Sequence, residues 1–132
     1  MENKIYEPHK SSIGNLDANV VALIAYIGSL ILGYIPIIKY VAFLVPIIIF
    51  IIEKESKFVK FHAMQSILLC AVSWIISIIL VIFRYSSVIW ILFIIIGLTL
   101  LVFYIIGAVK SYKYELYKMP LIGNWAEKIA LK

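Results

Sequence analysis

The distribution of apolar residues along the chain predicts four membrane-spanning helices. Apolar residues run almost unbroken from Val20 to Ile52, and two more apolar runs follow a charged connection. A straight helix over the first run would be about 50 Å long, whereas the hydrocarbon core of a bilayer is about 30 Å thick. Glycine commonly ends a helix and proline fits the first turn of the next, so Gly33 and Pro36 divide this run. The pattern predicts spans at about 18–35, 36–52, 63–83 and 88–109.

The second of these spans is short. Pro46 lies inside it and lacks a backbone N–H, which predicts a kink. A re-entrant hairpin that enters and leaves the membrane on the same side is therefore an alternative for residues 18–52. The sequence leaves both arrangements open.

The segments around the apolar runs are polar and short. Residues 1–17 are predicted to form a flexible cytoplasmic tail. Residues 110–132 are predicted to form a basic, aromatic cytoplasmic tail that contains a short amphipathic helix. Asn124 can cap that helix, and Ser86 or Ser87 can cap the last span. The predicted fold class is an all-α integral membrane protein, a four-helix transmembrane bundle with short amphipathic cytoplasmic segments.

Composition supports the membrane class. Apolar residues make up 64% of the 132 positions and charged residues 14%, against about 45–50% and about 25% in soluble domains. A soluble chain of this size has too little interior to hide so many apolar side chains. These values exclude a soluble enzyme, a disordered chain and a disulfide scaffold, and the single cysteine, Cys70, cannot form an intrachain disulfide.

Basic residues are distributed unequally between the two predicted sides. Four spans place both tails and the 53–62 connection together with ten lysines, and leave only Lys39 and Arg84 opposite. Because cytoplasmic loops are rich in Lys and Arg, we expect a multi-pass protein of the cell (inner) membrane with both termini in the cytoplasm. The net charge of +5 then indicates anionic lipid headgroups, and not nucleic acid, as partners.

The sequence contains no recognisable catalytic set. All seven carboxylates lie outside the predicted spans, and Glu53 and Glu55 are expected in a solvated loop. His9 and His62 have no Cys or carboxylate neighbours at metal-ligand spacing. We therefore expect a non-enzymatic protein with no catalytic residues, no cofactor and no metal site.

A polar stripe leads into the third span. At helical spacing its members lie along one face, which should be turned away from lipid. They can form interhelical hydrogen bonds, or line a polar groove that receives a peptide or partner helix, or use the histidine as a base or proton sensor. The candidate residues are His62, Gln65, Ser66, Ser73 and Ser77.

Aromatic and basic residues alternate just before this span. Such a segment can lie on the inner leaflet with its aromatic rings toward lipid and its lysines toward the headgroups, or it can simply start the helix. The candidate inner-leaflet anchor consists of Lys57, Phe58, Lys60, Phe61 and, in the tail, Trp125.

Two motifs carry a family resemblance. They are EKESKFVKFHAMQS at residues 53–66 and MPLIGNWAEK at residues 119–128. Together with the four predicted spans, these motifs make the chain resemble the DUF4870 family of small prokaryotic membrane proteins, related to the Tic20 component of chloroplast protein import. The resemblance implies a helical membrane bundle. For the plant relatives it implies a non-catalytic part of a protein-conducting complex, while the prokaryotic members have no known function.

The leading hypothesis is a non-enzymatic membrane protein that acts through a membrane-protein partner or as a homo-oligomer, in protein translocation or complex assembly. A small oligomeric transporter or channel is an alternative. A membrane-bound immunity or stress protein is another.

Overall fold

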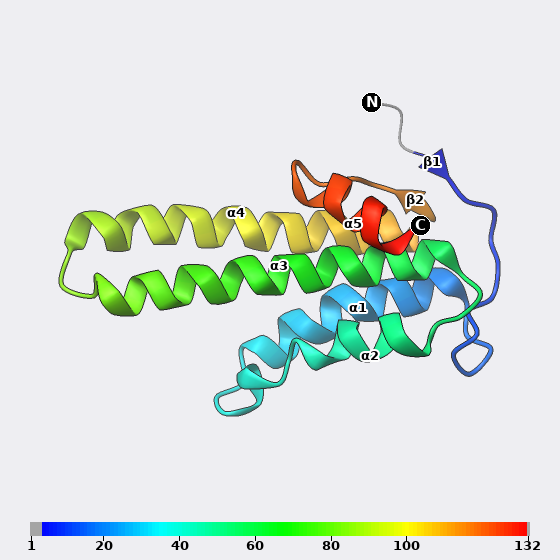
Figure 1. Cartoon of the computed structure of the whole chain (residues 1–132), viewed down its shortest axis with the longest axis horizontal. Coiled ribbons are helices and arrows are strands. Elements are labelled where there is room, and N and C mark those ends of the chain that lie inside the picture. Colours follow the sequence, from blue (N-terminus) through cyan, green and yellow to red (C-terminus); the bar gives the residue numbers. More distant parts are fainter. Residues whose placement is uncertain (1–3, 132) are drawn as a thin grey trace.

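A computed structural model describes residues 4–131 of the chain; residues 1–3 and 132, at the ends of the two predicted tails, lie outside it. The described part is mainly helical (Figure 1). In chain order its elements are β1 (Lys4–Ile5), α1 (Ala18–Gly33), the 3-10 helix η1 (Ile38–Tyr40), α2 (Leu44–Ile52), α3 (Lys57–Ile82), α4 (Ser87–Tyr112), β2 (Glu115–Leu116) and α5 (Ile122–Ala130).

Two long apolar helices, α3 and α4, form the centre of the molecule. Each has 26 residues, about 39 Å at the usual helical rise, so each is long enough to cross a bilayer. The Ser86 side chain accepts a hydrogen bond from the Ile89 amide, which confirms Ser86 as the cap of α4. Ser56 caps α3 in the same way, so this helix begins six residues before the predicted span.

The α1–α2 pair is shorter than the α3–α4 pair. Helix α1 has 16 residues and α2 has nine, about 24 Å and about 14 Å respectively. Figure 1 shows the α1–α2 pair ending well before the far end of α3 and α4. Neither helix of this pair reaches the 18 residues that a membrane-spanning helix of this kind needs.

Pro36 and Pro46 were predicted to start and to kink the second span, and the structure places both differently. Pro46 is the third residue of α2. A first-turn N–H has no acceptor within its helix, so Pro46 removes no helical hydrogen bond and kinks nothing. Pro36 lies in the loop after α1, which ends at Gly33 as predicted. The next residue, Ile37, has φ +74° and turns the chain sharply toward η1.

The two terminal segments meet at one end of the bundle (Figure 1). Strand β1 pairs antiparallel with β2, with Lys4 opposite Leu116 and Ile5 opposite Glu115. Residues 4–17, expected to be a flexible tail, instead pack along this end and hydrogen-bond to the α2–α3 connection. Both termini and this connection, which carry most of the lysines, therefore lie together.

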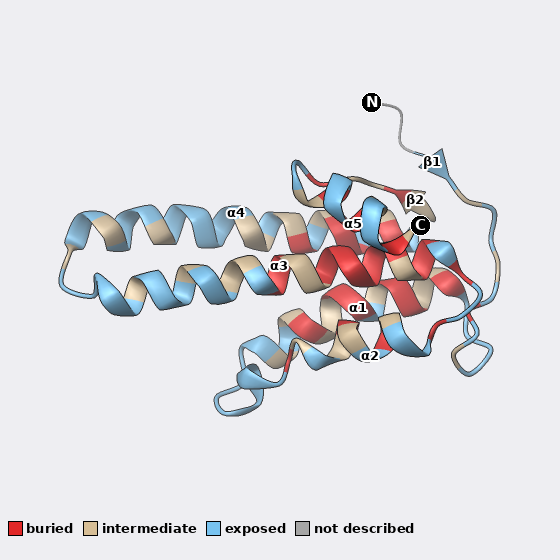
Figure 2. Cartoon of the chain, viewed as in Figure 1, coloured by how far each residue is buried: buried red, intermediate tan, exposed pale blue. Residues whose placement is uncertain are grey.

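Burial is concentrated in the same half of the molecule (Figure 2). There α1, α2 and α5 cover α3, and α1 packs against α4. The far halves of α3 and α4 expose apolar side chains on nearly every face, as expected for surfaces in contact with lipid. Helix α5 begins at Ile122 after Leu121, so the predicted cap at Asn124 is wrong.

Candidate functional site

The first half of the predicted polar stripe is buried inside the bundle. His62 has no exposed surface, and both ring nitrogens are hydrogen-bonded. Its Nε2 donates to the Glu115 carbonyl at 2.9 Å, and its Nδ1 accepts from the Tyr26 hydroxyl at 2.8 Å. His62 thus joins α3 to α1 and to β2.

Gln65 holds the segment that follows β2. Its Nε2 donates to the Tyr26 hydroxyl at 2.8 Å and to the Tyr117 carbonyl at 3.0 Å. Its Oε1 accepts from the Met119 amide at 3.0 Å. One fully buried amide therefore satisfies two backbone groups of a non-helical segment, which would otherwise be costly to bury.

Ser66 completes this internal framework. Its hydroxyl donates to the Ala25 carbonyl at 2.7 Å and lies 3.2 Å from the Ser29 hydroxyl. His62, Gln65 and Ser66 are therefore placed as interhelical hydrogen-bonding groups, and all three are fully buried. The sequence analysis did not identify Tyr26 and Ser29 as the hydrogen-bonding partners of this stripe. Two polar residues three positions apart in an apolar run lie on one helix face, and this spacing could have indicated their role.

The predicted inner-leaflet anchor is mostly internal. Phe58 and Phe61 are fully buried, so neither ring reaches lipid. Phe58 packs against Tyr6 at 5.4 Å and stacks on Tyr114 at 5.5 Å between ring centroids, because the docked terminal segments cover it. The remaining candidates lie nearer the surface: Lys57 is exposed, Lys60 lies over the Phe50 ring, and Trp125 is 65% exposed.

Glu53 was expected to be solvated and is fully buried instead. It accepts hydrogen bonds from the Ser11 hydroxyl, from the Ser12 hydroxyl at 2.6 Å and from the Ser56 amide at 3.0 Å. Burial alone would raise the pKa of this carboxyl. The hydrogen bonds from Ser11, Ser12 and Ser56 outweigh that effect and lower its pKa from 4.5 to about 2. Glu53 therefore fastens residues 11–12 to the α2–α3 connection.

Replacing Glu53 with Gln should reduce the free energy of unfolding at pH 7 by about 2 kcal/mol, because hydrogen bonds to a charged acceptor are lost. The carboxylate's contribution is present above its ordinary pKa of 4.5 and disappears as the pH falls through about 2. Unfolding in detergent across this range should show that dependence in the unsubstituted protein and lose it in Glu53→Gln. Glu55→Gln, at an exposed neighbour, is the control; an equal loss of stability in both variants at pH 7 would contradict the assignment.

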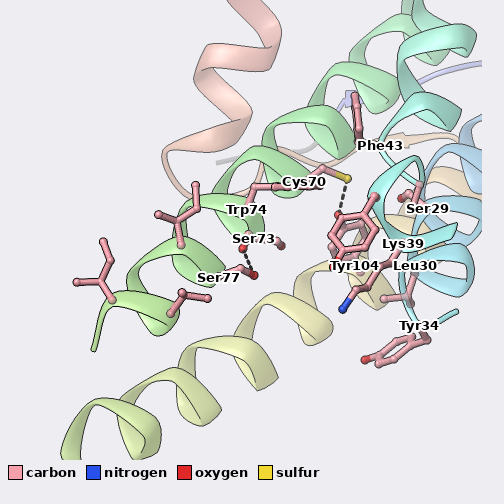
Figure 3. Close-up of a pocket in the computed structure, with 16 residues that line it drawn as sticks. Ser29, Leu30, Tyr34, Lys39, Phe43, Cys70, Ser73, Trp74, Ser77 and Tyr104 are labelled. Atoms are coloured by element: carbon pink, nitrogen blue, oxygen red, sulfur yellow. Dashed lines mark hydrogen bonds between the residues drawn. The ribbon is translucent and has the colours of Figure 1, made fainter. Parts of the chain in front are cut away.

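The second half of the stripe faces a lateral groove. Ser73 and Ser77 donate to the Leu69 and Ser73 carbonyls of their own helix, each at 2.9 Å. Both line a partly open cavity of about 620 Å³ between the α1–α2 tip, α3 and α4 (Figure 3). The Cys70 thiol and the Tyr104 hydroxyl meet at 3.1 Å in its wall.

Lys39 also lines this groove, a role that the sequence did not indicate. Figure 3 shows its ammonium nitrogen directed into the space between the α1–α2 tip and α3. The sequence identified Lys39 only as one of the two basic residues on the side opposite the termini. Its position along α3 could not be predicted, because that position depends on the lengths of α1 and α2. Within residues 4–131, no group of three or more His, Cys, Asp or Glu side chains comes together that could hold a metal ion.

These features define a helical membrane protein with a tied internal framework at one end and a lateral groove. Comparison with known proteins agrees with the class. The chain belongs to the magnetosome magnetite crystal formation protein family (MamF_MmsF), whose sequence profile matches residues 17–126. The specific role of this membrane protein family is unknown. The relationship to DUF4870 and Tic20 stays a prediction.

Curated relatives are also named as membrane proteins. A UPF0132 membrane protein of Methanocaldococcus jannaschii is 39% identical over 119 residues, 90% of this chain and 93% of the relative. A UPF0132 membrane protein of Archaeoglobus fulgidus is 39% identical over 82 residues, 62% of this chain and 78% of the relative. No solved structure matches the chain at a significant level.

Proposed function

We propose that this protein is a non-enzymatic integral membrane protein that works by binding other membrane components. The supporting observation is the use of its polar side chains. His62, Gln65 and Glu53 are buried and engaged in hydrogen bonds that tie the helices and terminal segments together. A large apolar surface remains exposed on the far halves of α3 and α4. Contacts within the membrane are the interaction that such a surface supports.

The proposed arrangement has α3 and α4 crossing the cell membrane and the α1–α2 pair entering from the cytoplasmic side as a hairpin. Two crossings and a hairpin keep both termini on one side, as four spans would. The two terminal segments and the α2–α3 connection lie at the same end of the bundle, and most lysines are in these segments. This distribution supports the arrangement, because lysines are enriched on the cytoplasmic side of membrane proteins. The likeness to Tic20 makes a scaffold in protein translocation or membrane-complex assembly the role we favour.

In-cell photocrosslinking tests the partner hypothesis. A photoreactive residue in place of Ile75 on α3 or Ile95 on α4, which are 58% and 57% exposed, should give one discrete adduct, identified by mass spectrometry as the same membrane protein from both positions. Tyr85, in the turn beyond the helices, is the control and should give none. Recovery of lipid alone would overturn the proposal, as would substrate turnover or ion flux by the purified protein in liposomes.

A further inference from the structure

In the proposed arrangement of the helices, on which this inference rests, the lateral groove lies at membrane depth, where a lysine is unusual. Ring-centroid distances of 6.1 Å from Tyr40 and 6.2 Å from Phe43 place the α1–α2 tip beside Trp74. Trp74 precedes the end of α3 at Ile82 by eight residues, about 12 Å along the helix. The loop that carries Lys39 therefore lies beside the apolar, exposed part of α3 and not level with its end.

Lys39 has no carboxylate partner in the described part of the chain. The ion pairs found within residues 4–131 are Lys10–Asp17, Lys110–Glu115 and Lys118–Glu127. The sequence contains no Asp or Glu between residues 17 and 53, or between residues 55 and 115. An ammonium group at membrane depth is costly without an anion or water, and such residues commonly mark binding sites. The groove thus has one positive charge and no internal counter-charge.

The rest of the groove is mainly apolar, and it is elongated. On α3 its lining residues recur every three or four positions, from Cys70 to Ile82, a length of about 18 Å. One leaflet of a bilayer core is about 15 Å thick, so the groove matches one hydrocarbon chain. A single hydrocarbon chain therefore matches the length of the groove.

We propose that the lateral groove binds a long-chain carboxylate, with its anionic head on the Lys39 ammonium and its single hydrocarbon chain along the α3 lining residues between Cys70 and Ile82. The lysine supplies the charge complement, and the length of the groove matches one chain. Trp74 lies in the wall, where a bound chain would contact its indole ring.

Tryptophan quenching tests this site. The chain has three tryptophans, so Trp90→Phe with Trp125→Phe leaves Trp74 as the sole reporter. In a neutral detergent, dibromostearic acid should quench Trp74 saturably and bind at least tenfold more tightly than its uncharged methyl ester. Equal quenching by the acid and the ester would overturn the proposal, even without any further variant.

Substitution of the lysine gives the second arm. Lys39→Gln should abolish the preference for the acid over the ester, whereas Lys39→Arg should retain it. Arg84→Gln removes the other cation at this end of the molecule and should change nothing, because Arg84 does not line the groove. Retention of the full preference in Lys39→Gln, or its loss in Arg84→Gln, would assign acid binding to something other than this site.

Discussion

Gln65→Leu is expected to be among the most destabilising single substitutions in this protein. It removes the donor to the Tyr117 carbonyl and the acceptor for the Met119 amide, and leaves both backbone groups without a partner. At about 1–3 kcal/mol for each unsatisfied buried group, the free energy of unfolding should fall by about 4 kcal/mol. Denaturant unfolding in micelles measures this loss, and hydrogen exchange at the Met119 amide should accelerate.

Thr99→Ala is the matched control for this change. The Thr99 hydroxyl donates to the Ile95 carbonyl of its own helix and reaches no other element, so its removal should alter the free energy of unfolding by less than about 0.5 kcal/mol. Similar stability of Gln65→Leu and Thr99→Ala would show that Gln65 does not hold the segment after β2.

Gly123→Ala should detach the carboxyl-terminal segment from the bundle. A β-carbon at position 123 would lie 2.6 Å from the Lys118 Cα and 2.8 Å from its carbonyl carbon. These are backbone atoms, which cannot move aside as the tip of a flexible side chain can, so the turn before α5 must open. We expect a loss of about 3 kcal/mol in the free energy of unfolding and rapid protease cleavage between β2 and α5.

Gly97→Ala tests the same substitution where space is available. Apart from its chain neighbours and the backbone of its own helix, no atom lies within 4 Å of a β-carbon built there, and alanine favours a helix over glycine by about 1 kcal/mol. This variant should therefore be as stable as the unsubstituted protein or slightly more so. Equal protease resistance of the carboxyl-terminal segment in both glycine variants would contradict the role given to Gly123.

The same close approach occurs at a second glycine. A β-carbon on Gly107 would lie 2.8 Å from both Met119 and the Tyr26 ring. The Tyr26 hydroxyl also hydrogen-bonds to both His62 and Gln65. The missing side chain on α4 thus lets α1 and the segment after β2 approach closely enough for the framework to form.

Local information was enough for the long helices. The apolar runs of α3 and α4 are continuous and longer than a bilayer core is thick, and Ser86 caps a helix within three residues of itself. Gly33 ends α1 for an equally local reason, since no partner elsewhere is needed to stop a helix there. The membrane class followed from the same runs, because a chain of this size cannot bury them in its own core.

Contacts between distant residues decided the rest. Glu53 looked solvated because its donor Ser11 lies 42 positions away in a segment that seemed unstructured. Phe58 looked available to lipid because Tyr114, which stacks on it, lies in the carboxyl-terminal segment, far away along the chain. Likewise, the depth of Lys39 depends on where the short α1–α2 pair ends against α3. By itself, the sequence determined which segments prefer the membrane, since that preference is a property of each segment alone. Only the tertiary structure decided which polar groups are satisfied internally and that Lys39 faces a groove, because hydrogen-bond partners are set by packing in space and not by spacing along the chain.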